Sequence, residues 1–304
     1  MLPFPSFTYE APETLDDAIA LATSEDVRVV AGGTDLLPSI KHRLFTPKTL
    51  LSLRKLTDLR AISTYDSGLH IGATATLMDV RRHPVVQAKY PALAAACQTI
   101  ATATIQNMGT LGGNIMLDTR CLFYNQPAGW REAINGCLKA EGSKCHVAPR
   151  GTGCYAAHSA DTIPALWLYG ARIALASPSG TREVLLSDLY DTDGRTWLKI
   201  QPGELLTHII IPPPATPVVH RKLRIRGAID YGLLLVAVQR QGDGARAVVS
   251  AIGPRPIEVS VDNADDLPDA TWKKSSPLPT HAIAAPWRKH MVRIEVRRAL
   301  QACP

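Results

Sequence analysis

The 304-residue sequence lacks any uninterrupted apolar run that is long enough to cross a bilayer. Its first residues, MLPFPSFTYE, have neither the basic start nor the apolar stretch of a secretory signal. The hydrophobic share of 46% and a mean hydropathy near zero are typical of a soluble globular protein. We therefore expect a cytoplasmic chain of two or three packed units that does not bind a membrane.

Motifs for nucleic-acid binding are also missing. The formal charge of +6 and the isoelectric point near 9.0 are compatible with an anionic partner. However, the basic residues are scattered, and no helix-turn-helix, RNP or zinc-finger pattern accompanies them. We expect no nucleic-acid partner, and we interpret the one C-terminal basic cluster as a solvated helix face (Arg288, Lys289, His290, Arg293, Arg297 and Arg298).

No catalytic constellation can be argued from the residues. The sequence offers no Ser-His-Asp ordering and no paired carboxylates, and its histidines outside the cysteine-rich segment have no partner at catalytic spacing. Cys97 stands in an alanine-rich segment, where a small buried side chain is expected. We therefore predict no catalytic residue in this chain.

Periodicity predicts alternating helices and strands in the first two thirds of the chain. Thr14, with Asp17 three residues later, is typical of the start of a helix, which we predict over residues 12–24. Thr76 is predicted to cap a second helix, which ends at Arg82. Residues 91–105 form another helix candidate. The predicted strands cover residues 27–30, 50–53, 69–73, 172–176 and 208–211.

Three prolines at residues 212–214 suggest a domain boundary. After them, residues 222–226, 233–238 and 247–252 are strand candidates. We expect a polar linker next, and then a final helix with Trp287, Met291 and Ile294 on one face.

Two glycine-rich turns are the first candidates for a binding site. The strand at residues 27–30 runs into Ala31-Gly32-Gly33-Thr34-Asp35-Leu36, and a second turn follows at residues 109–115. Glycine lets backbone N–H groups approach a phosphate, because it has no Cβ. Neither turn is a G-x-G-x-x-G or a P-loop motif, so a pair of tight structural turns remains an alternative.

Four of the six cysteines fall within residues 117–156, a stretch without clear periodicity: Cys121, Cys137, Cys145 and Cys154. Such a segment needs something other than a hydrophobic core to order it. In a reducing cytoplasm, metal ligation is the first expectation. Four thiolates suit a [4Fe–4S] cluster or structural zinc, although the close C-x2–4-C pairs favoured by zinc are absent. Two disulfides are a further alternative, and we expect His146 to be a solvated loop residue.

Several segments in order resemble one family. AGGTDLLPSIK, IGATATL, IQNMGTLGGNI, SADTIPAL, GELLTHIIIP and WRKHMVRIEVRRAL are similar to the FAD-binding subunit of the xanthine dehydrogenase and carbon monoxide dehydrogenase family. The resemblance covers nearly the whole chain. It implies an α+β protein with a PCMH-type FAD-binding fold of two α/β subdomains over residues 1–214 and a small α+β C-terminal domain over residues 215–304.

The same resemblance implies a set of FAD contacts. Asp161 matches a residue at the adenosine end, Leu206 an apolar residue at the adenine, and Lys222 and Asp230 two residues near the flavin, which Tyr231 flanks. The pyrophosphate loops match Val30, Ala31, Gly32, Gly33, Thr34, Asp35 and Leu36, and Thr110, Gly112, Gly113 and Asn114.

The cysteine segment is an insertion in this family, and it closely resembles the one that binds a [4Fe–4S] cluster in the flavin subunit of 4-hydroxybenzoyl-CoA reductase. By that resemblance, the partners are a molybdopterin-binding large subunit and a [2Fe–2S] small subunit in a dimer of heterotrimers. Ferredoxin is the expected electron donor for the reductive dehydroxylation of 4-hydroxybenzoyl-CoA. The alternatives are an oxidative molybdenum hydroxylase for another aromatic or heterocyclic substrate, and a free-standing redox sensor.

Overall fold

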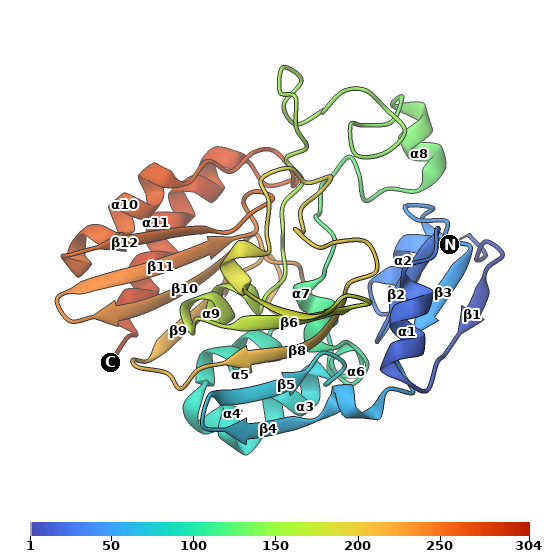
Figure 1. The fold of residues 1–304 in the computed structure, drawn as a ribbon. Helices are drawn as coiled ribbons and strands as arrows, with labels where there is room; N and C mark the ends of the chain where they lie inside the picture. Colours follow the sequence, from blue (N-terminus) through green and yellow to red (C-terminus); the bar gives the residue numbers. More distant parts are fainter. Residues whose placement is uncertain (1) are drawn as a thin grey trace.

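The computed structural model describes residues 2–304 and contains three β-sheets, each with helices against it (Figure 1). The first sheet is parallel, with the strand order β1-β3-β2. Its strands are β1 (Thr8–Glu10), β2 (Val27–Val30) and β3 (Thr49–Ser52), and its helices are α1 (Leu15–Ala22) and α2 (Leu36–Lys41). The backbone N–H of Asp17 donates to Oγ1 of Thr14 over 3.2 Å, which confirms the predicted start of α1.

The second sheet is antiparallel, with the strand order β4-β5-β8-β6-β7. Its strands are β4 (Ile62–Tyr65), β5 (Gly68–Gly72), β6 (Arg172–Ser177), β7 (Gly180–Leu185) and β8 (Leu205–Ile211). The helices that accompany it are α3 (Leu77–Arg82), α4 (Pro84–Lys89), α5 (Pro91–Gln98), α6 (Ala103–Gln106), α7 (Leu111–Ile115) and α9 (Ile163–Leu168). Short 3-10 turns cover Thr57–Arg60 and Leu186–Asp188.

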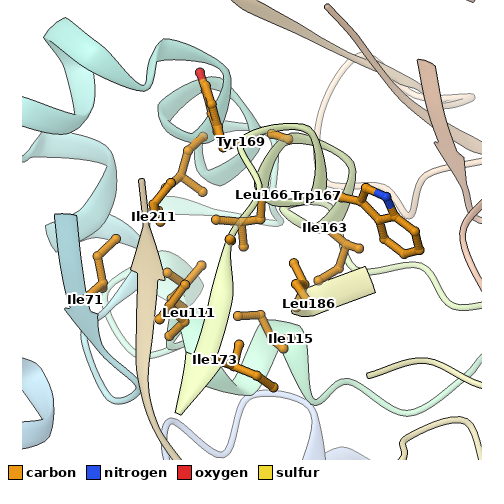
Figure 2. Packing of buried hydrophobic residues seen from close by; sticks show 14 of the residues in the cluster. Ile71, Leu111, Ile115, Ile163, Leu166, Trp167, Tyr169, Ile173, Leu186 and Ile211 are labelled. Atoms are coloured by element: carbon orange, nitrogen blue, oxygen red, sulfur yellow. The ribbon is translucent and has the colours of Figure 1, made fainter. Parts of the chain in front are cut away.

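The main hydrophobic core lies between this second sheet and helices α7 and α9 (Figure 2). Leu111 and Ile115 of α7 are fully buried, as are Ile71, Ile173 and Ile211 of the strands. Because α7 is part of the second glycine turn, the core fixes that turn in place.

The third sheet is antiparallel, with the order β12-β11-β10-β9, and is covered by α10 and α11. Its elements are β9 (Val218–Leu223), β10 (Leu234–Gln241), β11 (Gly244–Ser250), β12 (Ile257–Val261), a 3-10 turn (Ala264–Asp266), α10 (Leu267–Lys274) and α11 (Ala285–Gln301). The prediction of a polar linker before the final helix is therefore wrong, because β12 and α10 occupy that part of the chain. The predicted strand at residues 222–226 ends early, since the chain turns away at Leu223.

Two helix predictions also need correction. Residues 91–105 form α5 and α6 rather than one helix, and Ala101 between them has a positive φ of 44° that an α-helix does not allow. In α11 the buried side contains Val292 and Val296, whereas Trp287 is exposed. The buried face of α11 is therefore rotated about the helix axis relative to the predicted face, which began at Trp287.

The basic cluster on α11 is not a uniformly solvated face. Arg288 is only 1% exposed, and its guanidinium donates to the carbonyl oxygens of Leu233, Leu278 and Ala251. A buried guanidinium is tolerated here because main-chain acceptors replace water.

The cysteine segment extends beyond the second sheet, near α2 in Figure 1. Most of residues 117–156 are irregular, as predicted, but Ala128–Ala133 form a short helix, α8. No helix among residues 2–304 is long and apolar enough to span a bilayer.

Candidate functional site

A cavity of about 960 Å³ is lined by residues of β2 and β9 and by helices and loops that accompany the second sheet. Both glycine turns contribute to its wall, together with Ser159 and Asp161 just before α9 and the loop between β9 and β10. Of the predicted FAD contacts, the cavity is lined by Val30, Ala31, Gly32, Gly33, Thr34, Asp35, Leu36, Thr110, Gly113, Asn114, Asp161, Lys222 and Asp230. The structure therefore brings most of these residues together.

Two predicted contacts do not line this cavity. Leu206 lies on β8 in the hydrophobic core and is 6% exposed. Gly112 packs against the backbone, where a Cβ would come 2.6 Å from the carbonyl oxygen of Ala73. In this structure, the Leu206 side chain packs in the core, and Gly112 allows two backbone segments to pack closely.

The two glycine turns contact each other at Gly32. A Cβ on Gly32 would lie 1.9 Å from the carbonyl oxygen of Met108, just before the second turn. Gly33 has a positive φ of 70°, which L side chains rarely adopt. Glycine is therefore needed at Gly32 for the two turns to meet, and at Gly33 for the backbone conformation of the first turn.

The turns differ in the backbone donors that they offer. In the second turn, the N–H groups of Leu111 and Gly112 donate to carbonyl oxygens of the second subdomain, and that of Gly113 donates to Oγ1 of Thr110 over 3.0 Å. Within residues 2–304, the N–H groups of residues 32–35 have no protein acceptor. The first turn is therefore the one that presents a row of free donors to an anion.

Asp161 and Lys222 form a buried ion pair on the wall of the cavity. Nζ of Lys222 lies 2.5 Å from Oδ1 of Asp161, and it also donates to the carbonyl oxygen of Thr99 over 3.1 Å. Burial raises the pKa of Asp161, and the neighbouring ammonium opposes that rise. The resemblance assigned these two residues to different ends of FAD, and in the structure their side chains are in direct contact.

Asn114 connects the second turn to α9. Its Oδ1 accepts hydrogen bonds from Oγ1 of Thr162 over 2.7 Å and from the backbone N–H of Thr162 over 3.3 Å. This contact holds the turn beside Asp161.

Asp230 organises the loop between β9 and β10. Its carboxylate accepts from the backbone N–H groups of Ile225, Arg226 and Tyr231 over 3.2, 3.1 and 3.0 Å. Tyr231, on the same loop, is 57% exposed and its ring lies 4.8 Å from the guanidinium of Arg120.

Two further cavity residues were not identified from the sequence. Arg120 forms an ion pair with Asp35 of the first turn. Oγ of Ser159 is buried without a hydrogen-bond partner in residues 2–304. Ser159 lies within the family-like segment SADTIPAL, so the resemblance contained a signal for it, whereas the partner of Arg120 depends on the fold.

A second, small cavity is lined by all four cysteines of the inserted segment. Cys137, Cys145 and Cys154 are buried, and Cys121 is half-buried. All six cysteines of the chain are free thiols in the structure. Residues 2–304 contain no group of three or more Cys, His, Asp or Glu side chains arranged around a single metal ion.

Two thiols of this cavity, those of Cys121 and Cys154, are desolvated but accept backbone hydrogen bonds. Burial raises the pKa of Cys121 to about 11, and the N–H groups of Phe123 and Tyr124 oppose that shift. Burial also raises the pKa of Cys154, whose Sγ lies 3.5 Å from the N–H of Ala156. Such thiols need a bound cation or cluster to hold them as thiolates.

His146 differs from its prediction. It lines the cysteine cavity, its Nε2 lies 2.7 Å from the carbonyl oxygen of Gly136, and its ring stacks on Phe123 at 5.1 Å. It is therefore a packed residue, because the loop folds over it, and not a solvated one.

Arg131 attaches the inserted segment to the first subdomain. The side chain is 1% exposed, and its guanidinium donates to the carbonyl oxygens of His42 and Arg43, at the end of α2, over 3.1 and 2.9 Å. It also donates to the carbonyl oxygen of Gln126 over 2.7 Å and pairs with Glu141.

An α+β chain with a glycine-lined cavity between three subdomains and free backbone donors on one wall has the properties of a dinucleotide-binding flavoprotein. A family model for the FAD binding domain in molybdopterin dehydrogenase matches residues 5–214. The chain belongs to this family, as an FAD-binding subunit of a molybdenum hydroxylase.

Individual relatives agree. The aldehyde oxidoreductase FAD-binding subunit PaoB of Escherichia coli is 31% identical over 85% of each chain. The carbon monoxide dehydrogenase medium chain of Afipia carboxidovorans is 32% identical over 82% of this chain and 73% of that one. The structure of the reconstituted CO dehydrogenase from Oligotropha carboxidovorans superposes with a TM-score of 0.79 at 27% identity and covers 99% of both chains.

Proposed function

We propose that this chain is an electron-transfer subunit that holds FAD in the large cavity and a [4Fe–4S] cluster on Cys121, Cys137, Cys145 and Cys154. The observation that carries the proposal is that four cysteines, spread over an irregular segment, line one cavity. When bound, FAD exchanges electrons singly or in pairs and the cluster exchanges them singly.

The donor set fits a cluster better than zinc. A zinc ion needs its ligand atoms within about 2.3 Å of one point. The four thiols surround a shared space but do not converge on a single-ion position. Backbone N–H groups that point at Cys121 and Cys154 are also suited to a charged iron–sulfur group, whose potential depends on such hydrogen bonds.

The FAD assignment draws on the free donors of the first turn. We propose that the N–H groups of residues 32–35 hold the pyrophosphate, while the second turn fixes their position through the contact at Gly32. Ser159 supplies an unused hydroxyl, and the Asp161–Lys222 pair supplies a carboxylate and an ammonium at one end of the cofactor. Asp35, through its pair with Arg120, shapes the wall beside the pyrophosphate.

A conducting subunit needs an electron donor and an acceptor. We propose a molybdopterin-binding large subunit and a [2Fe–2S] small subunit as partners, in a dimer of heterotrimers. The relative from Afipia carboxidovorans is itself named as the medium chain of its enzyme. A free-standing sensor is the alternative, and copurification of tagged chain with or without two further subunits distinguishes the two.

The direction of electron flow has two candidates. The four-cysteine insert favours reductive dehydroxylation of 4-hydroxybenzoyl-CoA, with ferredoxin as the donor. The 31% identity to an aldehyde oxidoreductase subunit over most of the chain favours an oxidation, with an aldehyde as the first substrate to test. Assays of the purified complex with both substrates decide between them, and the isolated chain should turn over neither.

The cluster is tested by Cys145→Ser in the full complex. Serine is a poorer ligand for iron than a thiolate, so iron and acid-labile sulfide should fall by one cluster per FAD while FAD remains. Cys303→Ser, which lies outside the insert, is the matched control. EPR of the reduced complex should retain the [2Fe–2S] signals. Zinc in place of iron, or an unchanged cluster signal in Cys145→Ser, contradicts the proposal.

A further inference from the structure

The FAD cavity and the cysteine cavity share a wall. Lys139 lines the cysteine cavity, whereas Asp118 and Trp197 line the FAD cavity. Nζ of Lys139 lies 2.5 Å from Oδ1 of Asp118 and 4.4 Å from the centre of the Trp197 ring. Lys139 is therefore in direct contact with both of the other side chains, and these three residues, which we call the dividing wall, line the two cavities where they meet.

The ammonium of Lys139 is desolvated and fixed. The side chain is 5% exposed, and Nζ also donates to Oγ1 of Thr119 over 2.6 Å and to the carbonyl oxygen of Gly194 over 2.7 Å. The Tyr124 ring lies 4.7 Å from Nζ on another side. A charge that cannot move or be hydrated acts on its surroundings at a low effective dielectric and is hardly screened by salt.

The Asp118 carboxylate is also buried and fixed by its contacts. Its side chain is 13% exposed, and Oδ2 accepts a hydrogen bond from the Tyr124 hydroxyl over 2.9 Å. The carboxylate therefore compensates the ammonium at one fixed position, on the side of the FAD cavity. Removing either member leaves one buried charge without its partner.

We propose that the Asp118–Lys139 pair sets the reduction potential of the carrier held by the four cysteines, with Lys139 raising it and Asp118 lowering it. The inference rests on the proposed function, because it concerns the cluster assigned to that cavity. Each electron that the cluster accepts adds one negative charge, so a fixed ammonium favours the reduced form and a fixed carboxylate opposes it. The pair itself gains or loses no electron and no proton.

Lys139 is connected to one of the four cysteines through Gly194. Nζ of Lys139 donates to the carbonyl oxygen of Gly194 over 2.7 Å, and the backbone N–H of Gly194 donates to the carbonyl oxygen of Cys154 over 2.7 Å. A fixed positive charge at this position stabilises additional negative charge on a cluster bound by Cys154.

The test is a redox titration of the full complex, followed by EPR for the cluster and by visible absorbance for the flavin. Lys139→Met should lower the cluster potential and Asp118→Asn should raise it. The double variant, which removes both charges, should return it close to the wild-type value. Lys144→Met is the matched control, because Lys144 is exposed beside Cys145 and its charge is screened by water.

Iron, sulfide and FAD analyses separate the two proposals. A wild-type complex without cluster iron in this chain contradicts the proposed function itself. A wild-type complex with the cluster, in which the single variants leave the potential unchanged or move it in the same direction, contradicts only the role of the pair. If Lys139→Met loses its cluster, Asp118→Asn alone decides, since asparagine keeps the shape and can still accept from Tyr124; an unchanged or lowered potential then overturns the proposal.

Discussion

Replacing Arg131 should detach the inserted segment from the first subdomain. Methionine at this position keeps much of the side-chain volume but donates no hydrogen bond. The guanidinium serves three main-chain carbonyl oxygens, those of His42, Arg43 and Gln126, and the carboxylate of Glu141. A buried acceptor left without a donor costs about 1–3 kcal/mol.

The structure shows which of these contacts matter. Glu141 is 62% exposed, so its carboxylate regains water when the pair is broken, and Glu141→Gln should cost less than about 1 kcal/mol. Arg131→Met loses the three carbonyl contacts in addition, and we expect about 3–5 kcal/mol. A loss of about 3 kcal/mol corresponds to a roughly 100-fold larger open population of the insert.

Hydrogen–deuterium exchange of the holo complex measures this opening directly. Amides of residues 121–156 should exchange about 100-fold faster in Arg131→Met and only a few-fold faster in Glu141→Gln, while amides of β10 and β11 should be unchanged. Equal acceleration in the two variants means that the ion pair, not the carbonyl contacts, holds the insert. No acceleration in Arg131→Met refutes the reasoning altogether.

Three further substitutions test other contacts. Gly113→Val adds branches to the cavity wall and should abolish stoichiometric FAD binding, as measured by absorbance of the folded protein. Gly194→Ala places a Cβ 3.0 Å from Sγ of Cys154 and should lower cluster iron without lowering FAD. Hydrogen bonds from Arg182 lower the pKa of Glu204, so the ionised carboxylate stabilises the fold above its unfolded pKa of about 4.5. Glu204→Gln should therefore be less stable than wild type in urea at pH 7. The difference in stability should shrink as the pH falls below 4.5.

The elements that could be predicted from the sequence are those specified by neighbours along the chain. Thr76 is followed by a helix because its hydroxyl accepts from the N–H of Asp79 over 3.0 Å, a contact between residues three apart. Strands β2, β5 and β6 were found because β-branched and apolar residues mark them locally. The family-like segments likewise identified most of the FAD cavity wall.

The misplaced residues depend on contacts between distant parts of the chain. Arg288 was expected in solvent because it lies in a run of basic residues, yet it is buried by acceptors from Leu233, Ala251 and Leu278. Asp161 and Lys222 come from different subdomains, so their ion pair could not be inferred from either segment alone.

The inserted segment lacks a hydrophobic core of its own, and its attachment instead uses three cationic side chains. Arg120 reaches Asp35 in the first glycine turn, Arg131 reaches the end of α2, and Lys139 donates to the carbonyl oxygen of Gly194, which lies outside the segment. An apolar interface tolerates sliding, whereas a guanidinium or ammonium bound by several fixed acceptors does not. Polar attachment therefore fixes the distance between the four cysteines and the FAD cavity, as the proposed electron transfer between them requires.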